Sequence, residues 1–438
     1  MVGNATSNTL EEHNSPPLRA QENVLTFIPA DISKPPDGGY GWVIVGCNFT
    51  INCFTWGVIS AYGVTLSYYL DNNVFPGASS LDYALIGGLN FGVAMLAASP
   101  VNWITRRYGH HIPMFVGILL QSFGFIAASF CHDQIYQLYL SQGVLVGLGV
   151  GFLWIPSIAI LPQWFEKKRS VANGICSAGS GIGGIVFSFA TSAIIRKISL
   201  GWALRTTGIV SGGMNLIAAA LIRSRNKEIQ PYLHPFDLKL FKQLSACLLL
   251  AWGFIVMFGY ITILYSLPDF SRSIGLSSSQ GATVNAVLSL GTAVGRPLIG
   301  LLSDRYGRIE VTGYATLTCA ITVFGLWLPA QSYGLLLLFA LISGAILGVF
   351  WMAIGPLCAE LVGLKELPSL LALNWAAVAG PTTFAEVIAL KLRRPNSGRP
   401  YLYAQVFAGI SYLVASAIML ALWYDQRRKK NSASLRTW

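Results

Sequence analysis

Residues 283–308 of the chain read TVNAVLSLGTAVGRPLIGLLSDRYGR. The part before Ser303 is apolar for about 20 residues, which is the length that an α-helix needs to cross a bilayer. Arg296 lies inside this apolar run, and the run contains no carboxylate. Placing an arginine in hydrocarbon costs about 2.5 kcal/mol or more, so such a residue normally faces a water-filled path or binds an anion.

A polar stripe leads to this arginine. On an ideal helix Asn285, Ser289, Thr292 and Arg296 share one face, because they follow the i, i+4, i+7, i+11 spacing. The stripe predicts a lined route for a small anionic or polar solute. Two alternatives stay open, namely that Arg296 extends to the nearby membrane interface or that it pairs with a group on another helix.

The composition indicates a membrane protein along the whole chain. Of the 438 residues 54% are hydrophobic and 11% are charged, whereas soluble domains carry about 25% charged residues. Recurring apolar runs predict an all-α membrane protein, because a helix satisfies its own backbone hydrogen bonds in lipid. We expect twelve transmembrane helices, near residues 42–70, 82–104, 111–131, 136–160, 171–195, 202–223, 245–268, 280–302, 310–329, 333–358, 368–391 and 402–424.

The sequence contains no motif for a cofactor, a metal or an enzyme reaction. The seven cysteines are scattered without a CxxC or Cys/His cluster, so neither a zinc site nor a disulfide framework is expected. Gly179-Ser-Gly-Ile-Gly-Gly184 has the letters of a dinucleotide-binding fingerprint, but it lies in an apolar run with no strand before it. The motifs of serine hydrolases, P-loop proteins, kinases and HExxH metalloenzymes are absent. We therefore expect no enzyme and no cofactor.

The basic residues indicate the orientation in the membrane. With twelve spans both termini lie on one side, and that side carries 20 of the 29 lysines and arginines. The positive-inside rule places this side in the cytoplasm. We expect residues 1–40 to form a disordered cytosolic tail and residues 425–438 to form a basic cytosolic tail. The net charge of +11 therefore reflects membrane orientation and does not indicate nucleic-acid binding.

The chain contains an internal repeat. Residues 103–109, WITRRYG, follow the second span, and residues 302–307, LSDRYG, follow the eighth, with Gly109 and Gly307 198 residues apart. Asn173 in the fifth span and Asn374 in the eleventh are 201 residues apart. A period of this size indicates two copies of one structural unit.

The repeat predicts the domain organisation. We expect an N-terminal six-helix half at residues 41–223, a cytosolic central loop at 224–243 and a C-terminal six-helix half at 244–424. Repeats of this kind are a recurrent transporter architecture, in which the halves rock around a solute site near the bilayer midplane.

The loop after the eighth span carries a family resemblance. Gly300-Leu-Leu-Ser-Asp-Arg-Tyr-Gly-Arg308 resembles the loop signature of the major facilitator superfamily. The residues that carry it are Gly300, Asp304, Arg305, Gly307 and Arg308. The resemblance implies a conformational-switch motif, in which glycines allow a tight turn and the charged side chains bond neighbouring helix ends. The copy after the second span has Arg106 where the acidic residue is expected.

A more specific resemblance begins before the first span. Lys34-Pro-Pro-Asp-Gly-Gly-Tyr-Gly-Trp42 is similar to the opening signature of the monocarboxylate porter family, carried by Asp37, Gly38, Gly39, Gly41 and Trp42. Residues 164–181 and Gly295-Arg-Pro297 resemble further motifs of that family, so the resemblance covers about residues 35–425. The compact loops are similar to the fungal branch, which implies a secondary transporter of an organic acid or an exporter of a secondary metabolite.

The sequence departs from this family at two charged positions. In the lactate and pyruvate carriers of the family, a lysine in span one and an aspartate in span eight join the arginine. Here Ser60 stands at the lysine position and Thr292 at the aspartate position. The resemblance therefore implies that the charge of Arg296 is not neutralised by a neighbouring carboxylate and that it pairs with an anion directly. Glu386 is the candidate for a relocated proton-coupling site, and the alternative is an ion pair with the basic loop that follows it.

Other polar and aromatic residues are candidates for lining the path. The amides of Asn52 and Asn374 are unfavourable in lipid, so they should meet other helices or a cavity. Several aromatic side chains either stack on a planar or bulky substrate or serve as packing and interface anchors. These are Trp56, Trp154, Tyr265, Trp351 and Trp375.

We therefore expect a secondary transporter of the monocarboxylate porter type in the cell membrane. Its partners are a small organic anion or acidic metabolite, the lipid bilayer and protons, with no nucleic acid. The residues expected to contact the substrate are Arg296, Asn285, Ser289, Thr292, Asn52 and Asn374. The alternative is a membrane sensor or receptor that keeps the transporter fold without transporting.

Overall fold

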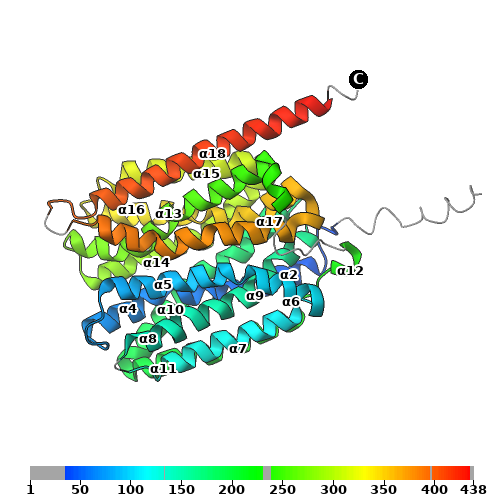
Figure 1. Ribbon diagram of the computed structural model, residues 1–438. Helices are drawn as coiled ribbons and strands as arrows, with labels where there is room; N and C mark the ends of the chain where they lie inside the picture. Colours follow the sequence, from blue (N-terminus) through cyan, green and yellow to red (C-terminus); the bar gives the residue numbers. More distant parts are fainter. Residues whose placement is uncertain (1–34, 133, 230–237, 395–396, 435–438) are drawn as a thin grey trace, which may run out of the picture. The chain divides into compact units, whose positions relative to one another are not determined.

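The structure is a computed structural model that describes residues 35–132, 134–229, 238–394 and 397–434. All regular secondary structure in these ranges is helical, so the all-α prediction is confirmed. Residues 1–34 of the predicted tail at 1–40, the middle of the central loop and the last four residues lie outside the described residues. The helices run side by side across Figure 1, with their connections at its two ends.

The helices that precede residue 224 are called the N-terminal group and occupy the lower part of Figure 1. They are α2 (Gly41–Phe54), α3 (Trp56–Ser60), α4 (Tyr62–Asp71), α5 (Ser80–Leu96), α6 (Ala98–Tyr108), α7 (His111–Ala128), α8 (Ile135–Leu138), the π-helical turn η1 (Tyr139–Leu145), α9 (Val146–Ile160), the 3₁₀ turn η2 (Leu161–Gln163), α10 (Arg169–Lys197) and α11 (Leu200–Leu221). The short elements α12 (Asn226–Ile229) and η3 (Leu238–Lys242) follow.

The helices that follow residue 243 are called the C-terminal group. They are α13 (Leu244–Ser273), α14 (Ser278–Tyr306), α15 (Arg308–Thr322), the π-helical turn η4 (Val323–Trp327), α16 (Tyr333–Leu347), α17 (Val349–Leu392) and α18 (Leu402–Ser434). Gly363, at φ 73°, interrupts α17 and separates two helical segments. The helix α18 continues past residue 424, where the last span was expected to end, because Asp425 and Lys429 form an i, i+4 ion pair that supports a further turn.

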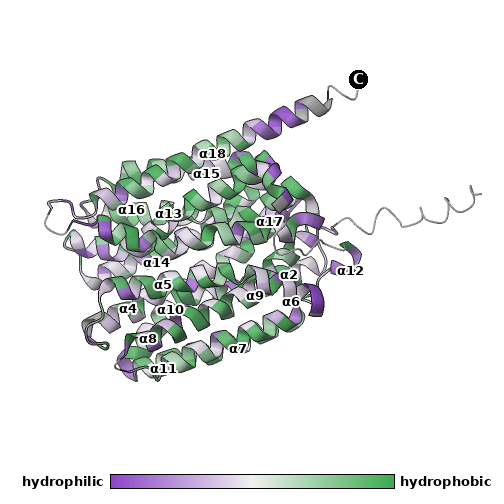
Figure 2. Cartoon of the chain, in the orientation of Figure 1, coloured by the Kyte–Doolittle hydropathy of each residue, from purple (hydrophilic) through white to green (hydrophobic). Residues whose placement is uncertain are grey.

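Ten stretches of the described residues are long and apolar enough to cross a membrane. Figure 2 shows hydrophobic residues along the middle of the helices and hydrophilic residues gathered toward their ends. One of the ten, Tyr333–Leu392, is 60 residues long and includes the interruption at Gly363. The 22-residue helix α11 is not among the ten.

The helix ends follow from local sequence signals. Ser79 begins α5 and Ser277 begins α14, each in a capping box with the residue three positions later. Gly109 ends α6 and Gly307 ends α14 at φ values of 84° and 107°, which only glycine adopts readily. We call the end of the bundle that holds Gly41, Gly109, residues 164–168 and Gly307 the terminal face.

The two groups meet where α10 crosses α14. A methyl group at Gly174 would lie 2.5 Å from the carbonyl oxygen of Arg296, and one at Gly181 would lie 2.6 Å from that of Ser289. Such clearances leave no room for a side chain, so the two backbones pack directly on each other. This crossing brings Arg296 of the C-terminal group against the N-terminal group.

Candidate functional site

A cavity lies between the two groups. Polar side chains from α2, α3, α10 and α14 and aromatic side chains from α3, α5, α9, α13 and α17 line it, together with Gly181, Leu264 and Leu288. The polar members are Asn52, Ser60, Ser180, Ser289, Thr292 and Arg296. Four of the six residues expected to contact the substrate therefore share one cavity.

Arg296 is buried in the wall of this cavity, with 5% of its surface exposed. Its Nη1 donates hydrogen bonds to the carbonyl oxygen of Ser177 at 2.8 Å and to Ser180 Oγ at 2.7 Å, both on α10. Its Nε has no hydrogen-bond partner. Within the described residues no carboxylate lies within ion-pair distance of the guanidinium. The cation therefore has donors left for an anion.

Gly348 makes room for this guanidinium. It lies between α16 and α17, and a methyl group on it would be 2.7 Å from Arg296 Nε and 2.8 Å from Cζ. Any larger residue would push the guanidinium away, so the break between α16 and α17 helps to define where the charge is held.

The polar stripe on α14 reaches the cavity only in part. Ser289 and Thr292 line it, and Thr292 Oγ1 also bonds the carbonyl oxygens of Leu288 and Gly344, each at 3.1 Å. Asn285 is half-buried and outside the lining. The reason is that four residues of helix separate it from Ser289 by about 6 Å along the axis.

The two candidate asparagines have different surroundings. Asn52 lines the cavity, where its Oδ1 accepts from Trp154 Nε1 at 3.2 Å and its Nδ2 donates to the carbonyl oxygen of Asn48 at 2.8 Å. Asn374 is fully buried beside Gly253 and lies outside the lining, and neither of its amide atoms has a hydrogen-bond partner. That Asn374 faces the path stays a prediction, since in this structure the residue lies on α17 beside Gly253 of α13.

Glu386 is buried between α17 and α13. Ser266 Oγ lies 3.1 Å from both of its carboxylate oxygens, and 5% of the residue is exposed. The basic loop after it pairs elsewhere, since Arg393 Nη1 lies 2.8 Å from Asp269 Oδ2, which Tyr401 also bonds. The ion pairs of the described residues include none between Glu386 and that loop.

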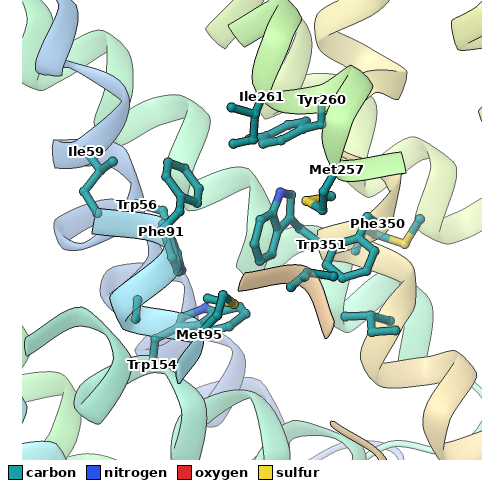
Figure 3. Close-up of a cluster of buried hydrophobic side chains, with 14 of the residues drawn as sticks. Trp56, Ile59, Phe91, Met95, Trp154, Met257, Tyr260, Ile261, Phe350 and Trp351 are labelled. Carbon is teal, nitrogen blue, oxygen red and sulfur yellow. The ribbon is translucent and has the colours of Figure 1, made fainter. Parts of the chain in front are cut away.

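Aromatic rings form the other wall of the cavity. Trp56, Trp154 and Trp351 line it as candidates from the sequence, together with Phe91 and Tyr260, which sequence reasoning missed. Figure 3 shows Trp351 between Trp56 and Phe91 on one side and Tyr260 on the other. Two further candidates, Tyr265 and Trp375, are outside the lining. No sequence signal separates lining aromatic residues from those that only pack.

Asn173 is a second residue whose position the sequence did not predict. From α10 its Nδ2 donates to the carbonyl oxygens of Met352 and, at 3.3 Å, of Trp351. The carbonyl of Met352 lacks its usual helical donor, because Pro356 four residues later has no N–H. Asn173 therefore joins the two groups at the segment of α17 that carries Trp351. The 201-residue repeat marked this residue without indicating its partner.

Asp304 caps a helix of the other group at the terminal face. Its Oδ1 accepts from the backbone N–H of Ser170 at 3.0 Å, and its Oδ2 accepts from that of Val171 at 2.8 Å. These N–H groups lie in the first turn of α10, where the helix dipole favours a negative charge.

Arg308 extends this link. It forms ion pairs with Asp304 at 3.3 Å and with Glu360 at 3.5 Å, and its Nη2 donates to the carbonyl oxygen of Glu166 at 2.7 Å. We call Asp304, Arg308 and Glu360, with the first turn of α10, the latch. The latch holds α10, α14, α15 and α17 together at the terminal face.

The remaining residues of the switch motif have other surroundings. Gly300 lies against Ser170, since a methyl group on it would be 2.6 Å from that carbonyl oxygen. Gly307 forms the turn between α14 and α15. Arg305 is exposed over the ring of Tyr306, 5.3 Å from its centroid, and forms no ion pair that the structure describes. It therefore lies outside the latch.

Asp37 holds the same loop from within the N-terminal group. Its Oδ1 accepts from the backbone N–H groups of Glu166 at 2.7 Å, Lys167 at 2.9 Å and Lys168 at 3.4 Å. The loop before α10 is thus bonded to Asp37 on one side and to the latch on the other.

The rest of the opening signature packs against this loop. A methyl group at Gly41 would lie 3.0 Å from Phe165 Cζ, and the ring of Trp42 lies 5.2 Å from the Phe165 ring. Gly39 has a φ of 58°, and Gly38 has open space around it. The signature therefore shapes the approach of the chain to α2 and seats it on the loop.

The comparison with known proteins shows the family. A sequence profile of the Major Facilitator Superfamily matches residues 44–242 and 249–437. The chain belongs to this superfamily. It is a multi-pass membrane transporter and not an enzyme. Its small-molecule cargo therefore passes through the protein chemically unchanged.

Individual relatives agree with this family. The chain is 35% identical over 387 residues to "Probable transporter MCH2" of Saccharomyces cerevisiae, covering 87% of this chain and 82% of that one. It is 29% identical over 400 residues to the "Fujikurins efflux protein" of Gibberella fujikuroi, covering 90% and 85%. A solved structure of the proton:xylose symporter XylE has a TM-score of 0.71 at 13% identity, covering 87% of this chain and 95% of that one, so the fold is shared.

Proposed function

We propose that the protein is a secondary transporter of the monocarboxylate porter type that moves an organic anion or acidic metabolite. The observation that carries the proposal is Arg296, a buried guanidinium in a cavity between the two groups with no carboxylate partner among the described residues. An unpaired buried charge is strongly unfavourable, so a binding anion that pairs with it gains a large electrostatic stabilisation.

The proposed membrane arrangement has twelve crossings and two six-helix halves, at residues 41–223 and 244–424. The 22 residues of α11 give a helix of about 33 Å, enough to cross a bilayer. The interruption at Gly363 supports counting Tyr333–Leu392 as two crossings. The excess of basic residues at the terminal face supports a cytoplasmic location for both termini, and the family resemblance supports the plasma membrane.

The proposed mechanism is alternating access around the cavity. Arg296 pairs with the acidic group of the substrate, while Ser289, Thr292 and Asn52 position the rest of it. The latch and Asn173 close the terminal face and must open for the cavity to face that side. No acid stands beside Arg296, so we propose that Glu386, a carboxylate buried between α13 and α17, carries a coupled proton.

Export is the proposed direction. The relative named "Fujikurins efflux protein" supports this direction. A proposed substrate larger than lactate is consistent with export of a metabolite. In the sequence the replacement of two charged positions by Ser60 and Thr292 leaves more room and fewer charges around the arginine.

The test is flux through purified protein in liposomes. A panel of short monocarboxylates and larger acidic metabolites would be followed by mass spectrometry, with and without an imposed pH gradient. Wild-type protein should transport at least one anion, and Arg296→Ala should abolish that flux at unchanged reconstitution. Arg296→Lys should retain part of it, because the charge stays while the planar fork is lost. Accumulation driven by the pH gradient should disappear in Glu386→Gln.

Arg196→Ala is the matched control, because Arg196 is an exposed arginine at the far end of α10. It should transport like wild type. Flux that persists in Arg296→Ala would overturn the role of Arg296. Binding of an anion by wild type without any flux would instead support a non-transporting sensor.

A further inference from the structure

The wall that faces Arg296 consists of aromatic rings that contact one another. The Trp351 ring centroid lies 5.5 Å from that of Trp56 and 6.0 Å from that of Tyr260, and Trp56 lies 5.3 Å from Trp154. Figure 3 shows these rings converging from helices of both groups. Since flat π faces attract flat π systems in offset or edge-to-face arrangements, this wall suits a planar ligand better than a saturated one.

Hydrogen-bond donors in this wall outnumber their partners. The indole Nε1 of Trp154 donates to Asn52, but Nε1 of Trp56 and Nε1 of Trp351 have no hydrogen-bond partner. Nε of Arg296 is also without a partner, and no carboxylate is among the residues that line the cavity. Buried donors normally find acceptors, so donors left over in a binding cavity indicate acceptor atoms on the ligand.

A short acid would contact only part of this wall. A three-carbon acid paired with Arg296 would leave the rings uncovered and the Trp56 and Trp351 donors unpaired. A flat acid with an oxygen on its ring covers the rings and supplies an acceptor at a distance from the carboxylate.

Building on the proposed function, we propose that the substrate is a planar aromatic or conjugated carboxylate with an additional acceptor oxygen on its ring. The carboxylate pairs with Arg296, the ring lies against Trp56 and Trp351, and the ring oxygen accepts from an indole N–H. The same arrangement excludes ring-bearing cations, because Arg296 repels them.

Four probes separate the parts of this proposal. They are 4-hydroxybenzoate, benzoate, cyclohexanecarboxylate and lactate, each measured for binding by the shift in Tm of the purified full-length protein and for flux in liposomes. We expect the affinity to fall in the order 4-hydroxybenzoate, benzoate, cyclohexanecarboxylate, lactate. We expect about a tenfold gap between 4-hydroxybenzoate and cyclohexanecarboxylate, the size of one aromatic contact.

Trp56→Phe tests the donor and leaves a ring in place. It should remove most of the preference for 4-hydroxybenzoate over benzoate while keeping the preference for benzoate over cyclohexanecarboxylate. Trp327→Phe is the matched control, because Trp327 is also fully buried with an unpartnered Nε1 but packs against Phe339 outside the cavity. It should keep both preferences.

The outcomes distinguish this inference from the proposed function. Arg296-dependent flux of lactate and cyclohexanecarboxylate equal to that of the aromatic acids would overturn the aromatic substrate and leave an organic-anion transporter. Equal loss of preference in Trp56→Phe and Trp327→Phe would overturn the role of the Trp56 donor. Absence of binding and flux for all four acids, with Arg296-dependent flux of a larger acidic metabolite, would overturn this inference and leave the proposed function standing.

Discussion

The loop that follows α14 and the loop that follows α6 share a backbone and differ in their side chains. Gly307 and Gly109 each end a helix at positive φ, and each donates its N–H to the carbonyl oxygen four residues earlier. Even the exposed arginines correspond, since Arg305 lies 5.3 Å from the Tyr306 ring and Arg107 lies 5.5 Å from the Tyr108 ring. The repeat therefore preserves the turn.

The difference lies in what each loop bonds. After α14, Asp304 and Arg308 reach α10 and Glu360. After α6, Arg106 stands in place of the aspartate, is exposed and has no partner in the part of the chain that the structure describes.

His110 stands in place of Arg308 and bonds within its own group, at Ser224 Oγ, 3.2 Å away. Burial and the neighbouring His111 lower the pKa of His110, which disfavours its charged form. Among the described residues, this region bonds the other group from Asn102 Nδ2 to the carbonyl oxygen of Pro368, at 3.3 Å. Among the described residues, charged side chains join the two groups after α14, whereas after α6 the contact is made by the neutral amide of Asn102.

Removing the charge from the latch should have the largest effect. Asp304→Asn loses a carboxylate that caps α10 and pairs with Arg308, and hydrogen bonds to charged groups contribute about 1.5–3 kcal/mol each. We expect the closed terminal face to become less populated and transport in liposomes to fall at least tenfold, since about 1.4 kcal/mol corresponds to tenfold.

Asp425→Asn is the matched control for this change. Asp425 is also a largely buried carboxylate, but its partners Ser245 and Lys429 both belong to the C-terminal group. It should lower the Tm without the loss of transport. Equal transport in wild type and Asp304→Asn would show that the latch does not govern the cycle.

Alanine substitutions at Gly307 and Gly109 should have an effect of intermediate size on stability. Gly307→Ala and Gly109→Ala both place a side chain at a φ that only glycine adopts readily, at a cost of about 1–3 kcal/mol each. At Gly307 the methyl group would also collide with the carboxylate of Glu310, which accepts from Trp423 Nε1 at 3.0 Å. At Gly109 the space is open.

We therefore expect a larger fall in Tm for Gly307→Ala than for Gly109→Ala, measured by thermal unfolding in detergent. Glu310→Gln in the Gly307→Ala background removes the charge from the crowded group and should not restore stability, because the volume is unchanged. Equal falls in Tm for the two alanine variants would show that crowding at Glu310 adds nothing to the strain.

The positions of the helices could be predicted from the sequence, because apolar runs and flanking charges are local signals. Arg296 could be placed at a cavity for the same reason, since a charge in an apolar run has few stable locations. An ideal helical face does not say where a cavity ends or how far a broken helix such as α17 turns, so the sequence did not indicate that Asn285 and Asn374 lie outside the lining. Those are properties of packing between helices.

The partners of the latch and of Asn173 were beyond sequence reasoning for a related reason. The motif identified Asp304, but its partners in the first turn of α10 are backbone N–H groups, which have no sequence signature. Asn173 meets a carbonyl freed by Pro356, and only the fold brings the two together. Phe91 and Tyr260 were missed because aromatic residues occur throughout the membrane helices.

The smallest effect on transport is expected from substitution of Arg106, in the loop that follows α6. Arg106→Ala removes an exposed side chain without an ion pair or hydrogen bond among the described residues, and such surface changes stay within about 0.5 kcal/mol. Transport in liposomes should stay within about twofold of wild type.

Arg106→Asp should have an equally small effect, although it restores the acidic residue that the repeat lacks. A carboxylate forms a latch only where a helix begins with free N–H groups, as α10 does at Arg169. Near Asn102 the neighbouring segment of α17 is already helical and contains Pro368, which has no N–H to offer. A large gain or loss of transport in Arg106→Asp would mean that this loop finds a helix end in the opposite-facing conformation, and the two loops would then alternate as latches.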